Sequence, residues 1–150
     1  MDRILLKITG SQLVDGQKDQ IELTTIGTMR DDGSAYIIRY TEEQEPPMAP
    51  VKVTVRIQKD ESVVQVTRSG GVESCLIVEK AKRNQCNYDT GFGNLLMGIY
   101  GRVIETDVSA DNGSFTFGYD IDVNGAVTSK NTVNMEYSIK EKENQNVLNC

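Results

Sequence analysis

The hairpin signature of this chain is SFTFGYDIDVNGAVTSKNTVNMEYSI, residues 114–139. Apolar residues occupy alternate positions on both sides of Asn124-Gly125. A period of two turns one face of a strand toward the interior. The Asn-Gly pair predicts a type I′ turn, because that turn needs a positive φ at both of its central residues. The stretch therefore predicts an antiparallel β-hairpin with long strands.

The same alternation recurs along the chain and is clearest at residues 51–58, where Val51, Val53, Val55 and Ile57 alternate with polar residues. No helical period of useful length is present. Short strands at regular spacing predict an all-β fold, an antiparallel closed barrel of about 8–10 strands, with a sandwich as the alternative. The expected strands besides the hairpin cover about residues 3–13, 21–29, 34–41, 51–58, 63–69, 72–79, 84–90 and 94–106.

Closure would remove the exposed strand edges of so much sheet. Glycines at Gly27, Gly98 and Gly101 interrupt strands and predict bends or bulges. Residues 42–50 carry all three prolines and predict a connecting loop. No linker or repeat is visible, so we expect one domain over residues 1–150, with 143–150 as a frayed tail.

The composition disfavours several classes of partner. The formal net charge is −6 and the pI is about 4.7. An acidic surface repels phosphate backbones and anionic lipid, so we expect neither nucleic-acid nor membrane binding. The N-terminus lacks the apolar core of a signal peptide, and no run is long enough to span a bilayer. Cys75, Cys86 and Cys150 form no disulfide framework, and we expect buried free thiols in a cytoplasmic protein.

The chain has no histidine and no tryptophan. Ser-His-Asp and Cys-His arrangements are therefore impossible within it, as are histidine-rich catalytic zinc sites. We expect no enzymatic activity and no cofactor. An enzyme that works through tyrosine, arginine and carboxylates is the least favoured alternative, because no recognisable reactive group is assembled.

Two short motifs match known ligand sites only in part. Asp120-x-Asp122-x-Asn124-Gly125 matches the first half of an EF-hand loop, but the required acidic twelfth position falls on Asn131. The flanking period of two also excludes the helices of that motif. Gly91-x-Gly93 lacks the third glycine of a dinucleotide fingerprint and leads into a strand. Both motifs are better explained as turns.

Several sequence features in order resemble the YwiB-like family of uncharacterised bacterial proteins. They are Ile21 to Gly27, Arg68-Ser69-Gly70, Tyr88 to Leu95, Ile104 with Asp107, Asn112-Gly113, and Tyr119-Asp120 with Val123. The resemblance extends from about Ile4 to Ile139. It implies a calycin-type, lipocalin-like antiparallel barrel in the bacterial cytoplasm, and it implies no activity.

Arg68 is the main candidate for a ligand contact. It shares the parity of Val64 and Val66, so it is expected to point inward near the end of its strand. A buried arginine needs a partner, because an unpaired buried charge is costly. The partner is either an internal carboxylate that forms an ion pair or lid, or the acidic group of a bound ligand.

Other polar side chains share inward parity and complete the candidate site. Tyr40, Tyr88, Tyr119 and Tyr137 are candidates to line the same interior, although buried tyrosines often only bond the backbone. Ser129 and Asn131 share the parity of Val133 on the last strand. Inward polar groups in a small barrel indicate a wet cavity, a polar network or a shifted register.

These patterns favour a non-enzymatic binding protein that holds a small acidic or amphipathic ligand inside the barrel. The alternative is a structural or interaction protein that forms a homodimer around a solid core. Strands that are apolar on both faces, such as residues 72–79, motivate this alternative.

Overall fold

The computed structural model describes residues 1–70, 73–89 and 93–142, without the side chains of residues 86–89 and 94. This part of the chain contains ten strands and no helix. The strands are β1 (Asp2–Val14), β2 (Gln17–Asp31), β3 (Ala35–Glu42), β4 (Val51–Gln58), β5 (Val63–Gly70), β6 (Ser74–Glu79), β7 (Arg83–Asp89), β8 (Asn94–Val108), β9 (Asn112–Val123) and β10 (Ala126–Glu141). The predicted tail at residues 143–150 lies outside the described residues.

The predicted hairpin is confirmed as β9 and β10. Asn124 and Gly125 form its two-residue turn, with φ values of 52° and 88°. Both angles are positive, as a type I′ turn requires. The register shifts between Val127 and Ser129, which marks a β-bulge just after the turn.

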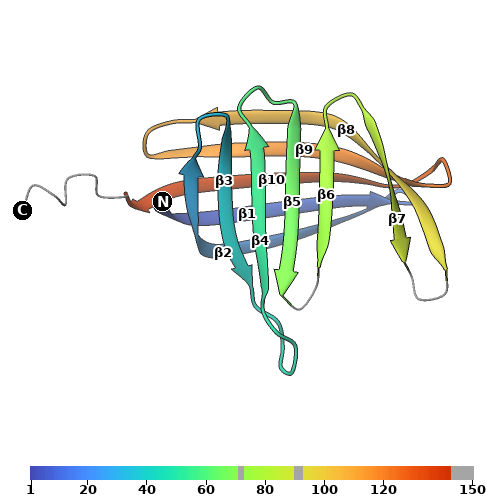
Figure 1. Ribbon diagram of the computed structural model, residues 1–150, viewed down its shortest axis with the longest axis horizontal. Helices are drawn as coiled ribbons and strands as arrows, with labels where there is room; N and C mark the ends of the chain where they lie inside the picture. Colours follow the sequence, from blue (N-terminus) through green and yellow to red (C-terminus); the bar gives the residue numbers. More distant parts are fainter. Residues whose placement is uncertain (71–72, 90–92, 143–150) are drawn as a thin grey trace, which may run out of the picture.

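One antiparallel sheet contains all ten strands in the order β6-β5-β4-β3-β2-β1-β10-β9-β8-β7. Each strand therefore pairs with its neighbour in sequence, except that β1 pairs with β10 and β6 does not pair with β7 in a ladder. Figure 1 shows β3, β4, β5 and β6 running across the longer strands β1, β8, β9 and β10. The sheet thus folds over itself, and two crossing layers enclose the interior. The prediction of an all-β antiparallel barrel is confirmed.

The barrel is nearly closed. A short seam of backbone contacts joins the segment after β6, at one edge of the sheet, to β8 near the other edge. An isolated bridge links Lys80, just after β6, to Gly101 in β8. The amide of Ala81 donates to the carbonyl of Gly101 at 2.8 Å, and the amide of Gly101 donates to the carbonyl of Lys82 at 3.2 Å. A Cβ at Gly101 would stand 2.1 Å from the carbonyl oxygen of Glu79, so glycine is needed for this approach.

The predicted irregularity at Gly101 is confirmed by a register shift between Gly101 and Val103. Gly27 serves a different purpose. A Cβ there would stand 2.6 Å from the carbonyl oxygen of Arg39, at the place where the pairing of β2 with β3 ends. Gly27 therefore permits a close approach of two backbones, without a register shift in its own pairing with β1.

Inward-facing side chains from both layers form the hydrophobic core. On β4, Val51, Val53, Val55 and Ile57 are each no more than 2% exposed, while the residues between them face outward. Burying an aliphatic side chain of this size contributes about 1.5–3 kcal/mol relative to leaving it exposed. One cluster of buried side chains connects all the layers, and it draws on β1 to β6 and β8 to β10.

β6 departs from two expectations. Val78 is fully buried but Ile77 is 41% exposed, so the strand buries one face rather than both. Cys75 is a free thiol on the exposed face, and the prediction of a buried thiol is wrong for this residue. The reason is that Cys75 has the parity of the exposed Ile77, on the face of β6 that points away from the core. Cys150 and the side chain of Cys86 lie outside the described part.

Aromatic rings fill the end of the barrel near the turn between β2 and β3. The ring of Phe115 lies 5.5 Å from that of Tyr36 and 5.6 Å from that of Tyr137, measured between centroids. The ammonium group of Lys59 covers the Tyr36 ring at 5.1 Å. We call Tyr36, Phe115 and Tyr137 the aromatic plug. Its stacked and tilted rings pack this end of the interior.

Candidate functional site

A cavity of about 490 Å³ lies in the other half of the barrel, between the crossing layers. Its deeper wall is apolar and comes from strands of both layers. The apolar lining includes Ile8, Val55, Val66, Leu76, Phe117 and Met135. At the rim, Ile21 on β2 is 73% exposed, which leaves this side of the cavity open to solvent. The volume falls in the range of small-molecule sites, about 300–1,000 Å³.

The hollow has a simple origin in β1. Ile4 and Leu6 are fully buried, and Gly10 continues their parity into the cavity lining. A Cβ at Gly10 would meet no atom within 4 Å. Where a larger residue would fill the interior, the chain has no side chain, and space remains.

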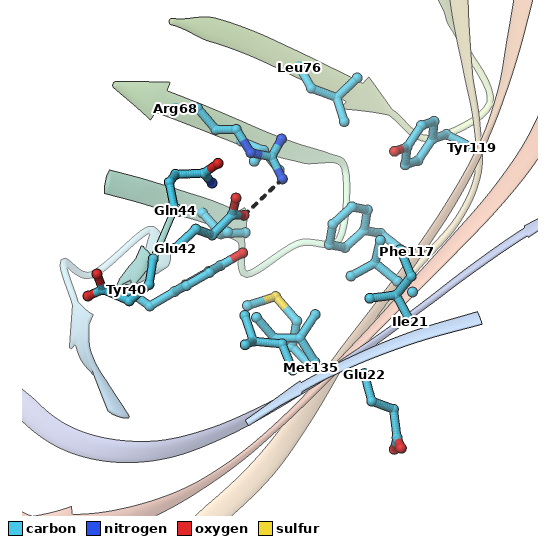
Figure 2. A pocket seen from close by; sticks show the side chains of 17 residues that line it. Ile21, Glu22, Tyr40, Glu42, Gln44, Arg68, Leu76, Phe117, Tyr119 and Met135 are labelled. Carbon is cyan, nitrogen blue, oxygen red and sulfur yellow. Dashed lines mark hydrogen bonds and ion pairs between the residues drawn. The ribbon is translucent and has the colours of Figure 1, made fainter. Parts of the chain in front are cut away.

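Arg68 and Glu42 form an ion pair at the mouth of this cavity. Arg68 occupies the inward face of β5, as the alternation with Val64 and Val66 predicts, and it lines the cavity. Its Nη2 lies 3.3 Å from Oε1 of Glu42. The two side chains are 37% and 27% exposed. Figure 2 shows the guanidinium group directed into the cavity, with the carboxylate beside it.

The register of three strands explains why these two residues meet. Tyr40 on β3 is opposite Val53 on β4, and Val53 is opposite Arg68 on β5. Glu42 follows Tyr40 on the same inward face of β3. A single contact of 3.3 Å between partly exposed groups is a weak ion pair, worth about 0–1 kcal/mol. Another acidic group can therefore compete for the guanidinium at small cost.

Two tyrosine hydroxyls face the same space. Tyr40 lies beside Glu42, and Tyr119 lies across the cavity next to Phe117 (Figure 2). The ring centroids of Tyr119 and Phe117 are 6.3 Å apart. Burial raises the pKa of Tyr40 to about 12, with the charge of Glu42 adding to the rise and Arg68 opposing it. Burial also raises the pKa of Tyr119, and Arg68 again opposes the rise. Neither hydroxyl bonds to another described residue, so both are free to donate to a ligand.

Ser129 and Asn131 do not line the cavity. They are 6% and 9% exposed, and the amide of Asn131 donates to the Ser129 hydroxyl at 3.0 Å. Asn131 is opposite Tyr119 on β9 and lies nearer the start of β10 than the lining residues Val133 and Met135. Both side chains are buried, as their parity predicts, but they hydrogen-bond to each other outside the cavity. The side chain of Tyr88 lies outside the described part of the structure.

The sequence reasoning missed Glu42, Gln44 and the apolar wall. Glu42 was assigned to the proline-bearing loop, although it is the last residue of β3. Its parity with Ile38 and Tyr40 is the signal that could have placed it inside. Gln44 lies just beyond the strand, and no pattern predicts its contact with the cavity.

Charges near the rim are largely paired. Glu22 is held by Lys7, with Nζ 3.2 Å from Oε1, and Glu42 is held by Arg68. Glu43 also lines the cavity and has no ion pair among the described residues. Within these residues, no group of three or more His, Cys, Asp or Glu side chains is arranged to hold a metal ion.

Another ion pair, in which only the carboxylate is buried, joins two strands of the sheet away from the cavity. Asp122 on β9 accepts two hydrogen bonds from Arg83 on β7, each of 2.7 Å, across the face of β8. Gly98 lies beneath, where a Cβ would overlap both side chains. Arg83 lowers the pKa of the Asp122 carboxyl, so this pair is fully ionised at neutral pH. It holds the last strand of the sheet in place.

The fold and cavity define a class: a small, nearly closed antiparallel β-barrel with an apolar cavity and a polar mouth. The chain belongs to the family described as a domain of unknown function, DUF1934, whose model matches residues 6–135. It is similar in structure to the YwiB protein from Bacillus subtilis, with 23% sequence identity and a TM-score of 0.76 over 92% of each chain. Among curated proteins, no significant match was found. The resemblance to the YwiB-like family is thereby confirmed.

No helix in the described residues is both long and apolar enough to cross a membrane.

Proposed function

We propose that this protein is a non-enzymatic binding protein of the bacterial cytoplasm, and that its cavity holds a small amphipathic molecule with an acidic head. The observation that carries the proposal is the position of Arg68 at the mouth of an apolar cavity. A few convergent polar groups on an otherwise apolar site are typical of small-molecule binding. No reactive group is needed for this role.

The head of the ligand is placed by hydrogen-bond donors. Arg68 has five N–H groups in a fork that matches a carboxylate, and Glu42 accepts from one of its nitrogens. The hydroxyls of Tyr40 and Tyr119 add two donors that have no described partner. These three side chains favour a head with several acceptor oxygens, and a carboxylate can engage the fork with both oxygens.

The tail of the ligand is placed by the apolar wall. Phe117 and Met135 are 3% and 1% exposed and lie deep in the cavity, while Ile21 and Leu23 extend the apolar surface to the rim. Burial of apolar ligand surface contributes about 25 cal/mol per Å² before the costs of association. A linear or branched hydrocarbon tail of modest length suits this shape.

Calorimetric titration with three ligands of equal tail length tests the proposal. Decanoate, decanol and decylamine carry the same tail with an anionic, a neutral and a cationic head. We expect decanoate to bind best and decylamine worst, because Arg68 attracts only the anion. Arg68→Gln should weaken decanoate binding by about ten-fold, the effect of losing about 1.4 kcal/mol, and leave decanol binding unchanged.

Matched variants separate the head contact from general charge. Arg30→Gln removes an exposed arginine outside the cavity and should leave all three affinities unchanged. Glu42→Gln frees Arg68 from its competitor and should tighten decanoate binding several-fold. Equal affinity for the three ligands, or no binding of any, would refute the proposal.

A homodimer is the second candidate, and exposed apolar side chains on β6 and β8 favour it. Ile77 on β6 and Leu96 and Tyr100 on β8 are 39–41% exposed. Apolar groups gathered on one surface are typical of interaction sites. Light scattering over a range of concentrations tests this role, and Ile77→Glu should shift a dimer toward monomer. A monomer at every concentration would exclude it.

A further inference from the structure

A second hollow, of about 500 Å³, lies on the outer surface where β2 and β3 separate. The ladder between these strands ends at Thr28 and Arg39, although β2 continues beyond this point along β1. Gly27 lies at the point of separation and borders the hollow. Tyr40 and Val53 contribute to the lining of the hollow, and its rim consists of outward-facing residues of β1 to β5.

The charges of this hollow are all positive. Arg3, Arg39 and Lys52 line it, and no carboxylate does. Arg39 and Lys52 form no ion pair with any described residue. Arg3 has one weak pair with Glu141 at 4.0 Å, between side chains that are 60% and 74% exposed. In a chain with 22 acidic and 16 basic residues, a hollow without acids is a departure from the surrounding surface.

The sheet register sets a row of alternating charges and hydroxyls along one side of the hollow. Arg3 is opposite Thr28, Thr28 is opposite Arg39, and Arg39 is opposite Thr54. Directly opposed residues share a face, with Cβ atoms about 4.5–5.5 Å apart. The Cβ of Arg39 therefore lies between those of Thr28 and Thr54 on the same face.

A second row runs parallel to the first. Lys52 is opposite Thr41 on β3 and opposite Ser69 on β5. Lys52 and Arg39 are diagonal neighbours on the face of β3 and β4, and such positions are about 7–8 Å apart along the sheet. Like charges on neighbouring side chains repel one another, and an anion bound between them would offset that repulsion.

We propose that this outer hollow binds a phosphate group, with Arg39 and Lys52 supplying the charge and the neighbouring Thr54 and Ser69 hydroxyls supplying further donors. A phosphate has enough acceptor oxygens to bond a guanidinium fork, an ammonium group and hydroxyls together. A carboxylate has only two oxygens and satisfies fewer of these donors. This site is separate from the cavity at Arg68, although Tyr40 borders both.

Titration of ¹⁵N-labelled protein with sodium phosphate, followed by NMR, tests the site. We expect saturable shifts of the amides of Arg39, Lys52 and Ser69, with sodium chloride and sodium acetate at equal ionic strength causing much smaller changes. The double variant Arg39→Gln/Lys52→Gln should lose at least about ten-fold in phosphate affinity. It should fold normally, because it removes only exposed charges that repel each other. Arg30→Gln should behave as the wild type.

Two further arms identify the carrier of the phosphate. Glycerol 3-phosphate represents a soluble ester, and vesicles of phosphatidylglycerol in phosphatidylcholine represent a lipid headgroup. Binding of either that depends on Arg39 and Lys52 supports the site and names its source. Shifts that follow ionic strength alone, or a double variant that retains phosphate affinity, would overturn it. Decanoate binding should be unaffected in the double variant, so failure here is distinct from failure of the inner cavity.

Discussion

The two ends of β3 face different interiors. Tyr36 packs in the aromatic plug, where Phe115 is 1% exposed and Tyr137 is 4% exposed. Tyr40, four residues later on the same face, borders a cavity of about 490 Å³. The same alternation builds both ends. The comparison teaches that the size of the inward side chains, above all the absence of one at Gly10, decides whether a barrel of this kind is solid or hollow.

Truncation inside the aromatic plug should have the largest effect. Phe115→Ala should lower the free energy of unfolding by about 3–5 kcal/mol, because it opens a void among packed rings. Leu76→Ala at the hollow end should cost only about 1 kcal/mol, because Leu76 is partly exposed and already borders empty space. Urea unfolding measures both. Equal losses would contradict the difference between the two ends.

A substitution at the seam should lower the free energy of unfolding nearly as much as truncation in the aromatic plug. Gly101→Ala places a methyl group against the backbone of Glu79 and should cost about 1–3 kcal/mol. Hydrogen exchange of the amides of Ala81 and Gly101 should accelerate, because these amides close the barrel. Gly10→Ala, at a site with open space, is the matched control and should leave stability nearly unchanged. Similar effects at the two glycines would argue against the seam.

Tyr137 in the aromatic plug and Tyr40 at the cavity allow the two ends of the barrel to be compared by their stability at high pH. Burial raises the pKa of both Tyr137 and Tyr40 to about 12, from 10.0. A raised pKa contributes stability that is complete below pH 10 and is lost as the pH rises toward 12. Tyr137→Phe and Tyr40→Phe should each reduce this alkaline loss in thermal unfolding scans. Only Tyr40→Phe should also weaken decanoate binding, since Tyr137 lies outside the cavity. If both variants lose as much stability at high pH as the wild type, the burial of these hydroxyls is contradicted.

Gly10→Leu should have the smallest effect on stability and the largest effect on ligand binding. Gly10→Leu fills open space in the cavity and should change the free energy of unfolding by less than about 0.5 kcal/mol. It should abolish decanoate binding in calorimetry, because the side chain occupies the site of the tail. Full decanoate affinity in this variant would show that the ligand binds elsewhere.

Much of the fold could be predicted from the sequence, because strand alternation and the Asn124-Gly125 turn are local signals. The pairing of Arg68 with Glu42 could not, since the two residues are 26 positions apart and meet only through the registers of β3, β4 and β5. Parity correctly gave Ser129 and Asn131 an inward direction. It could not say how far along β10 the cavity extends.

Native mass spectrometry tests the central claim most directly, because it counts molecules held by the intact chain. Wild-type protein with added decanoate should carry one decanoate per chain. Under the same conditions Arg68→Gln should carry less, and Gly10→Leu should carry none. A bare wild-type chain, or equal loading of all three proteins, would contradict the account of a hollow end with Arg68 at its mouth.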